Sequence, residues 1–293
     1  MVFDWKKGIK QSELNIVVDT LKNDGLVILP TETVYGLGAN ALMSEAAKKI
    51  YAAKGRPSDN PLIVHISKTE DVNNIAREIP EIFYKLAECF WPGPMTVVLK
   101  KQSIIPDDTS GGLDTVAVRL PDNNIARALI EVSKVPIAAP SANTSGRPSP
   151  TRASHVFDDM DGRIDMIIDG GTVGIGVEST IVDLTGDIPT LLRPGAVTFE
   201  MLQEVCTEVD IDPAIEHLLV SGEAPKAPGM KYKHYAPKAD MKMIKGNEAA
   251  VLDYLKKEIS ESEIKTAILT VDEHRAVLEK IIADNNKENI KLL

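Results

Sequence analysis

Residues 26–38 read LVILPTETVYGLG, an apolar run that passes directly into a polar turn containing two glycines. The run predicts a buried strand over residues 25–30. The patterns on either side predict helices over residues 12–22 and 44–54. Strands that alternate with amphipathic helices are typical of an α/β domain. The hydroxyls, carboxylate and phenol of the turn could contact a ligand, and a capped turn is the alternative interpretation.

The same alternation extends through the first two hundred residues. Further strands are expected over residues 62–66, 96–100, 115–120, 135–139, 166–169, 179–183 and 190–193. Further helices are expected over residues 81–90, 123–132 and 200–205 and around Ser154. The sequence thus predicts an α/β first domain over residues 1–208.

The composition of the sequence changes between residues 209 and 239. This segment contains four prolines and shows no amphipathic period after His217. We expect a linker there. Beyond it, residues 241–244, 248–259, 266–271 and 273–283 read as strand, helix, strand and helix. Residues 240–293 are therefore expected to form a small βα domain, thin for a unit that folds alone.

Composition limits the class of function. The 293 residues carry 33 basic and 43 acidic side chains, a net charge of −10, which argues against a protein that coats nucleic acid. Cys89 and Cys206 stand far apart without metal-ligand spacing, so a disulfide scaffold and a zinc module are both excluded. The charged start and the short apolar runs predict a cytoplasmic protein with no export signal or membrane span.

The standard nucleotide-binding fingerprints are missing, but polar clusters follow several apolar runs. Four cations, Lys54, Arg56, Arg119 and Arg193, are expected at the ends of elements, where an α/β sheet binds ligands. Lys54 and Arg56 lie in KGRP, which is also an ordinary helix stop. Arg119 interrupts an apolar strand and needs a carboxylate or a ligand as partner. This arrangement favours a small polyanion such as a nucleoside triphosphate.

Six ordered motifs identify a family resemblance. PTETVYGLG, KGRP with NPLIVHI, TVAVRLP, APSAN, GVESTIVD and LRPGAV closely resemble the YrdC-like L-threonylcarbamoyladenylate synthase family. The segment APGMKYKHYAP, residues 227–237, resembles the linker of its longer, two-domain members. The resemblance implies a twisted, open, mixed sheet with flanking helices. It also implies a nucleotidyltransferase that condenses L-threonine, bicarbonate and ATP to threonylcarbamoyl-AMP and pyrophosphate, for the modification of tRNA.

The resemblance also implies roles for individual residues. It assigns the binding of threonine to Thr33, His65, Arg119, the backbone of Ala139 and Ser179. It assigns the binding of ATP to Lys54, Arg56, Asn60, Thr115, Ser141, Asn143, Ser149 and Arg193, with Tyr235 as a lid residue on the linker. Lys54 and Arg56 are expected to act electrostatically on the phosphates. Mg²⁺ is expected to arrive with ATP, because no carboxylate cluster suggests a protein metal site.

Two alternatives and one departure accompany this interpretation. The same fold could serve as an RNA-binding module without adenylate synthesis, although the net charge of −10 weighs against it. A related carbamoyl-adenylate domain of hydrogenase maturation is normally embedded in a longer chain with zinc-finger-like Cys motifs. The longer family members carry a fuller second domain, so residues 240–293 are expected to be a shortened or incomplete one. A downstream tRNA threonylcarbamoyl transferase is the expected partner.

Overall fold

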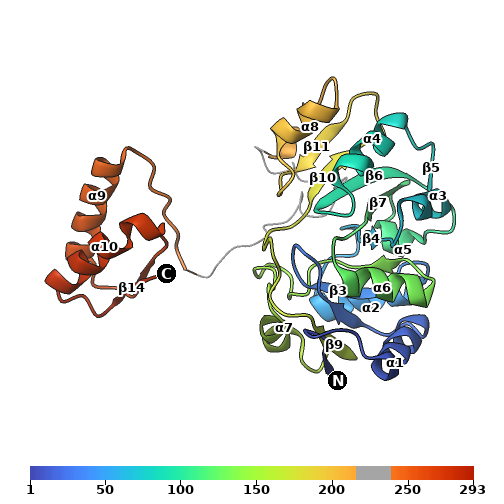
Figure 1. The fold of residues 1–293 in the computed structure, drawn as a ribbon, viewed down its shortest axis with the longest axis horizontal. Helices are drawn as coiled ribbons and strands as arrows, with labels where there is room; N and C mark the ends of the chain where they lie inside the picture. Colours follow the sequence, from blue (N-terminus) through green and yellow to red (C-terminus); the bar gives the residue numbers. More distant parts are fainter. Residues whose placement is uncertain (216–238) are drawn as a thin grey trace. The chain divides into compact units, whose positions relative to one another are not determined.

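The chain divides into two compact units, Met1–Pro237 and Lys238–Leu293, in the computed structural model (Figure 1). The structure describes residues 1–215 and 239–293. Most of the expected linker, including Tyr235, lies outside the described residues. Each unit is considered by itself.

The first unit alternates strands with helices. Its strands are β1 Val2–Asp4, β2 Val27–Leu29, β3 Gly36–Asn40, β4 Ile63–His65, β5 Ala76–Arg77, β6 Met95–Lys101, β7 Thr115–Arg119, β8 Ile137–Ala138, β9 Met166–Asp169, β10 Thr180–Asp183, β11 Thr190–Arg193 and β12 Asp210–Ile211. Its helices are α1 Gln11–Lys22, α2 Ser44–Lys54, α3 Val72–Ile75, α4 Glu81–Phe90, α5 Asp107–Ser110, α6 Asn124–Ser133, α7 Ala153–Met160 and α8 Phe199–Val205, with the 3₁₀ turns η1 Thr69–Asp71 and η2 Pro213–Ile215.

These strands form one mixed sheet in the order β1-β9-β2-β3-β8-β4-β7-β6-β10-β11-β12, with β5 paired to β6. β4 and β7 run parallel, with His65 opposite Arg119. β6 and β7 run antiparallel, so Thr96 also lies opposite Arg119. The predicted α/β fold with a mixed sheet and flanking helices is confirmed.

Helices cover both faces of the first half of the sheet. On one face, α1 and α6 lie side by side and bury Val17 and Leu129 against β2, β8 and β9 (Figure 1). On the other face, the main core extends under the whole sheet, from Ile28 to Val182. Beyond β8, the face that α1 and α6 cover carries a smaller apolar cluster, and the site lies there.

Strand β3 was not expected from the sequence, because its residues GLGAN are small and lack a strand pattern. All five residues are buried between β2 and β8. A Cβ atom on Gly38 would lie 2.5 Å from Leu29 Cδ2, so the close approach of β2 requires glycine.

The second unit packs α9 Glu248–Glu261 and α10 Asp272–Asp284 onto two parallel strands, β13 Thr266–Ile268 and β14 Ile290–Leu292. The strand predicted over residues 241–244 is wrong, and β14 pairs with β13 instead. Met241 and Met243 are 69% and 82% exposed and have no core to pack against. Ile290 is buried with Ile259 and Leu278, which explains why the second strand forms at residue 290.

Candidate functional site

The turn after β2 is closed by the hydroxyl group of Thr31. Its Oγ1 accepts hydrogen bonds from the backbone N–H groups of Thr33 and Val34, both at 3.2 Å, and donates to the Val34 carbonyl at 2.6 Å. This is a local cap of the kind that hydroxyl side chains favour. The same turn presents Glu32 and Thr33 to Arg119. The capped turn and the candidate site are therefore one structure.

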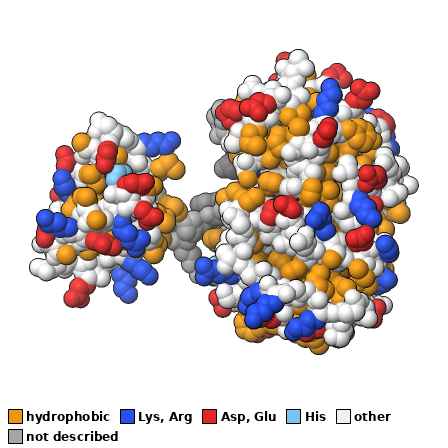
Figure 2. All heavy atoms as spheres, in the orientation of Figure 1, with side chains coloured by type: hydrophobic (Ala, Val, Ile, Leu, Met, Phe, Trp, Pro, Cys, Tyr) orange, Lys and Arg blue, Asp and Glu red, His pale blue; other side chains and the backbone are white. Residues whose placement is uncertain are grey.

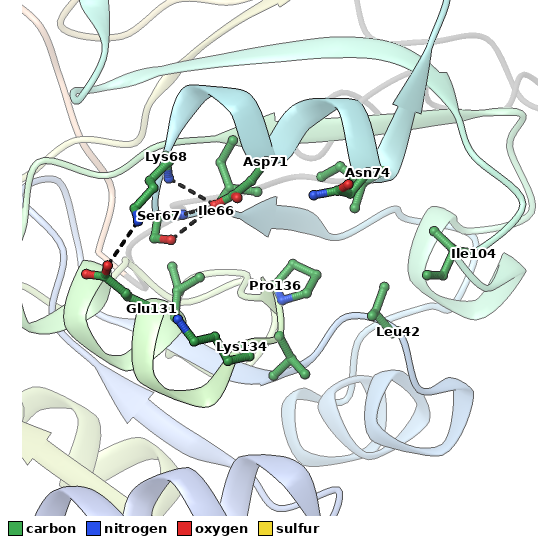
Figure 3. A pocket seen from close by; sticks show the side chains of 13 residues that line it. Leu42, Ile66, Ser67, Lys68, Asp71, Asn74, Ile104, Glu131, Lys134 and Pro136 are labelled. Atoms are coloured by element: carbon green, nitrogen blue, oxygen red, sulfur yellow. Dashed lines mark hydrogen bonds and ion pairs between the residues drawn. The ribbon is translucent and has the colours of Figure 1, made fainter.

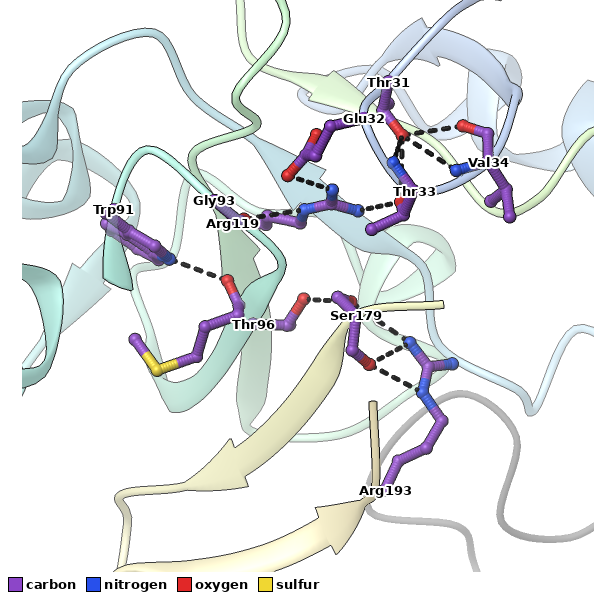
Figure 4. A network of polar contacts seen from close by, with 11 residues as sticks. Thr31, Glu32, Thr33, Val34, Trp91, Gly93, Thr96, Arg119, Ser179 and Arg193 are labelled. Atoms are coloured by element: carbon purple, nitrogen blue, oxygen red, sulfur yellow. Dashed lines mark hydrogen bonds and ion pairs between the residues drawn. The ribbon is translucent and has the colours of Figure 1, made fainter. Parts of the chain in front are cut away.

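Arg119 is the buried centre of the network in Figure 4, with 4% of its surface exposed. Its Nη1 donates to Thr33 Oγ1 at 2.9 Å, and its Nε donates to the Gly93 carbonyl at 3.3 Å. Its Nη2 lies 2.7 Å from Glu32 Oε1. The carboxylate that the strand arginine requires is thus Glu32, which lies 87 residues earlier in the chain.

A row of polar side chains crosses the sheet beside Arg119. His65 lies opposite it on β4 and Thr96 on β6. Thr96 Oγ1 lies 2.7 Å from Ser179 Oγ, and Arg193 Nη2 donates to Ser179 Oγ at 3.2 Å and to its carbonyl at 2.9 Å. Figure 4 shows the contacts among Thr96, Ser179 and Arg193 as a second set beside those of Arg119. The neighbouring strands β4, β7 and β6 therefore place polar side chains opposite one another, and Ser179, directly before β10, and Arg193 on β11 continue the row.

Burial keeps His65 neutral. The side chain is 2% exposed, and burial, followed by the nearby positive charge of Arg119, lowers the pKa of His65 from 6.5 to about 3. Its Nδ1 lies 3.2 Å from the Ile63 carbonyl, which requires Nδ1 to carry the proton if the two are hydrogen-bonded. A neutral imidazole can then accept a hydrogen bond at Nε2.

Lys54 ends α2 and is buried, and its Nζ donates to the carbonyls of Ser141 at 2.5 Å and Asn143 at 2.6 Å. Gly55 follows with φ +61°, so the helix stop expected from KGRP is present. Burial, followed by the charge of Arg56, holds the pKa of Lys54 well below its usual value. An anion placed beside it would favour the charged form.

Arg56 and Asn60 follow this lysine by two and six residues. Arg56 Nη2 donates to the carbonyls of Asn60 at 3.2 Å and Pro61 at 2.9 Å. Asn60 is 1% exposed, and within residues 1–215 and 239–293 neither its Oδ1 nor that of Asn143 has a hydrogen-bond partner. Buried amide oxygens without partners are uncommon, so both are candidates for ligand contacts.

The loop that follows β8 is anchored at two points. Asp159 on α7 accepts a hydrogen bond from the Thr144 backbone N–H at 3.2 Å and pairs with Arg147. Ser149 donates to Glu178, which directly precedes Ser179. The loop carries Ser141, Asn143 and Ser149. Through the contact with Glu178 it is linked to Ser179 and so to the polar row on the sheet.

Gly195 packs directly against the segment before β10, which is possible because glycine has no side chain. A Cβ atom there would lie 2.5 Å from the Thr180 nitrogen and 2.6 Å from the Glu178 carbonyl oxygen. The close approach of the two backbones fixes Ser179 and places Arg193, two residues away, against it. This gives the motif LRPG a structural reason.

One face of β4, β7, β6 and β10 carries both the polar row and an apolar strip. Because alternate residues share a face, we call this surface the site face and define it by Ile63, His65, Thr96, Val98, Thr115, Ala117, Arg119, Ser179 and Ile181. Ile63, Val98, Ala117, Ile181 and Leu192 form its apolar strip. Thr115 lies at the other end of β7 from Arg119, four residues or roughly 13 Å away.

The structure therefore brings most of the predicted site residues together in two groups. His65, Arg119, Ser179 and Arg193 belong to the polar row, and Thr33 contacts Arg119. Lys54, Arg56, Asn60, Ser141, Asn143 and Ser149 lie along the KGRP segment and the loop after β8. The backbone N–H of Ala139 already donates to the Ile63 carbonyl at 2.9 Å, which leaves its carbonyl as the group to consider. Tyr235 is outside the described residues.

Three residues of the site received no role from the sequence. Glu32 pairs with Arg119, Thr96 contacts Ser179, and Asp159 anchors the loop after β8. Glu32 stands inside the PTETVYG motif, so its position carried a signal. Asp159 and Thr96 look like ordinary helix and strand residues, and only their partners distinguish them.

A cavity of about 330 Å³ lies elsewhere, between β4, α3 and α6 (Figure 3). It is lined by apolar side chains such as Ile66 and Ile130 and crossed at its rim by the Lys68–Glu131 ion pair. Of the predicted site residues that the structure describes, none lines it.

Neither the charges on the face drawn in Figure 2 nor the metal-binding residue types within the described residues indicate a second site. Acidic and basic side chains are interspersed on the face drawn in Figure 2. In the described ranges, no three His, Cys, Asp or Glu side chains gather as metal ligands would. No helix among those residues is long and apolar enough to cross a membrane.

Two family models match the chain. One, described as telomere recombination and covering Sua5, YciO and YrdC proteins, matches residues 19–195. The other, described as the C-terminal domain of threonylcarbamoyl-AMP synthase, matches residues 197–291.

Individual relatives agree with these matches. A threonylcarbamoyl-AMP synthase of Pyrococcus abyssi is 51% identical over 246 residues, 84% of this chain and 72% of the relative. A Bacillus subtilis protein of the same name is 46% identical over 258 residues, 88% of this chain and 73% of the relative. The crystal structure of P. abyssi Sua5 complexed with L-threonine matches with a TM-score of 0.88 and 44% identity, covering 100% of this chain and 91% of the other.

Proposed function

Because the chain belongs to the threonylcarbamoyl-AMP synthase family, we propose that its site face binds L-threonine beside ATP and joins them, with bicarbonate, into threonylcarbamoyl-AMP. The protein is a transferase of the nucleotidyltransferase type, with threonine and ATP as substrates. The family and enzyme class expected from the sequence motifs are thereby confirmed. The RNA-binding alternative is not favoured.

The observation that carries the residue assignments is the row formed by His65, Arg119, Thr96, Ser179 and Arg193. Arg119 supplies a planar fork of N–H donors that suits the threonine carboxylate. Thr33, His65 and Ser179 surround it with groups that can hydrogen-bond a hydroxyl or an amine. The Ala139 carbonyl, next to Ile63 on the adjacent strand, completes the proposed threonine set.

The proposed ATP set lies along the same surface. Lys54, Arg56 and Arg193 supply positive charge for the phosphates, and Asn60, Ser141, Asn143 and Ser149 supply hydrogen-bonding groups. The apolar strip between Arg119 and Thr115 is buried, with Ala214 packed against it. Thr115, at the edge of this strip, offers a hydroxyl to the nucleoside. We also assign Tyr235 to the nucleotide as a lid residue, on the resemblance of the linker alone.

The proposed chemistry needs no covalent nucleophile from the protein. The neutral amine of threonine takes up carbon from bicarbonate and forms a carbamate with loss of water. A carbamate oxygen then attacks the α-phosphate of ATP and expels pyrophosphate. Placing both reactants on one face is worth ~7 to 11 kcal/mol of the barrier when their alignment is close to that of reaction. Fixed cations stabilise charge that develops on the phosphates.

Several wider assignments belong to the same proposal. ATP enters as its Mg²⁺ complex, so the metal is part of the substrate. The product passes to a transferase that modifies tRNA, and the reaction takes place in the cytoplasm. We divide the chain into a catalytic domain over residues 1–208, a linker and lid over 209–239, and a small C-terminal domain over 240–293. No strong direct binding of nucleic acid is proposed.

The test is pyrophosphate release with each of the three substrates omitted in turn. We expect release only when threonine, bicarbonate and ATP are all present. The Arg119→Ala variant should require far more threonine, whereas Arg77→Ala, which removes an exposed arginine paired with Asp114, should behave like the unaltered protein. Release that persists without threonine or bicarbonate would contradict the proposal.

A further inference from the structure

Glu32 and Arg119 form a buried ion pair whose hydrogen-bonding capacity is not used. Their side chains are 12% and 4% exposed, and Oε1 and Nη2 are 2.7 Å apart. Even so, neither oxygen of Glu32 nor Nη2 of Arg119 makes an aligned hydrogen bond within the described residues. A carboxylate can accept about four hydrogen bonds, and buried polar groups are normally satisfied. The pair balances charge and leaves both a donor and two acceptors open.

We propose that Glu32 binds the α-amino group of threonine while Arg119 binds its α-carboxylate, so that the pair selects an α-amino acid over other carboxylic acids. The inference rests on the proposed function and adds a residue to it. In an α-amino acid, one carbon bears both groups. A carboxylate seated on Arg119 therefore brings the amino group close to a second group that contacts the same guanidinium. Thr33 and Gly93 also contact this guanidinium, but of the three groups only the Glu32 carboxylate is an anion that suits an ammonium group (Figure 4).

The backbone that carries Glu32 is held by hydrogen bonds within the chain. Its backbone carbonyl accepts a hydrogen bond from Ile175 N–H at 2.9 Å, and the next carbonyl, of Thr33, accepts one from Gly176 N–H at 2.9 Å. The Thr31 hydroxyl closes the turn from the other side. A carboxylate on so constrained a turn acts as a preformed acceptor, which reduces the entropy lost on binding.

The contact also serves the reaction. The amine must present its lone pair to the carbon of bicarbonate, and an acceptor that holds an N–H bond fixes the direction of that lone pair. Glu32 thus binds the reacting nitrogen as well as selecting for it. The alternative is that Glu32 only occupies Arg119 and is displaced by the substrate carboxylate.

A comparison of two ligands separates these roles. Binding of L-threonine and of the 2,3-dihydroxybutanoate that carries a hydroxyl in place of the amine is measured calorimetrically without ATP. Both ligands carry the same carboxylate, so any effect that Glu32 has on its binding through Arg119 is the same for both. The ratio of the two affinities therefore measures only the contribution of the amino group. We expect Glu32→Gln to reduce the preference for threonine at least about tenfold, because the lost hydrogen bond involves charged groups. Glu32→Asp should restore part of it.

Glu78→Gln is the matched control, since it neutralises a carboxylate that pairs with an arginine, Arg77, outside the site and should leave the ratio unchanged. An unchanged ratio in Glu32→Gln, or tighter binding of both ligands to it, would overturn the inference in favour of displacement. The unaltered protein provides a test that needs no variant, because it must prefer threonine to the hydroxy acid at least about tenfold. Equal affinities there would also overturn the inference. If the unaltered protein does not release pyrophosphate in a threonine-dependent manner, the proposed function itself is overturned.

Discussion

Acidification from pH 7 to pH 5 should destabilise the first unit by about 2 kcal/mol through His65 alone. The folded protein holds the pKa of His65 at about 3, whereas the unfolded chain has the ordinary value of 6.5. Between these values the unfolded chain binds the extra proton, so stability falls as the pH falls. Protonation of His65 favours the unfolded chain more at pH 5 than at pH 7. The figure of about 2 kcal/mol is RT, about 0.6 kcal/mol, multiplied by the natural logarithm of the resulting change in the unfolding equilibrium constant. It hardly changes if the folded pKa is one unit higher.

Urea denaturation at the two pH values measures this loss. Both tryptophans, Trp5 and Trp91, are buried in the first unit, so their fluorescence reports its unfolding. His65→Asn removes the titrating group and keeps an amide that can reach the Ile63 carbonyl. Other titrating groups affect both proteins alike, so the variant should lose about 2 kcal/mol less than the unaltered protein between pH 7 and pH 5. The same pH dependence in both would refute the buried, neutral histidine.

Three further predictions concern the site. Arg119→Lys keeps the charge but loses the planar fork, so threonine should bind at least about tenfold more weakly by calorimetry, with ATP affinity retained; equal threonine affinity would count against Arg119 as the carboxylate partner. Asp159→Asn should weaken the hydrogen bond that holds the loop at Thr144. The KM for ATP should then rise roughly tenfold, with little change in the KM for threonine. Equal changes in the two KM values would contradict the assignment of this loop to ATP binding. ATP should raise the depressed pKa of Lys54, so its binding should be accompanied by proton uptake. A binding enthalpy that depends on the ionisation enthalpy of the buffer, measured over a series of pH values, detects this uptake. Lys54→Met should abolish it, and identical uptake in the two proteins at every pH would refute the prediction.

The elements whose residues follow a clear period were predictable from the sequence. Helices 44–54 and 81–90 and strands 166–169 and 190–193 have the predicted bounds. The strand Gly36–Asn40 was not predictable, because its small residues are chosen for close packing between two neighbours. The strand predicted over residues 241–244 followed local pattern in a segment that has no core to pack on.

The sequence by itself determined the α/β class, the family and the residue types of the site, because hydrophobic period and motif order are local properties of the chain. The tertiary structure alone decided which of those residues meet. Strand register sets His65 and Thr96 beside Arg119, and a turn 87 residues away supplies Glu32 as its partner. The depressed pKa values of His65 and Lys54 also arise only there, because burial and neighbouring charge come from packing and not from spacing along the chain.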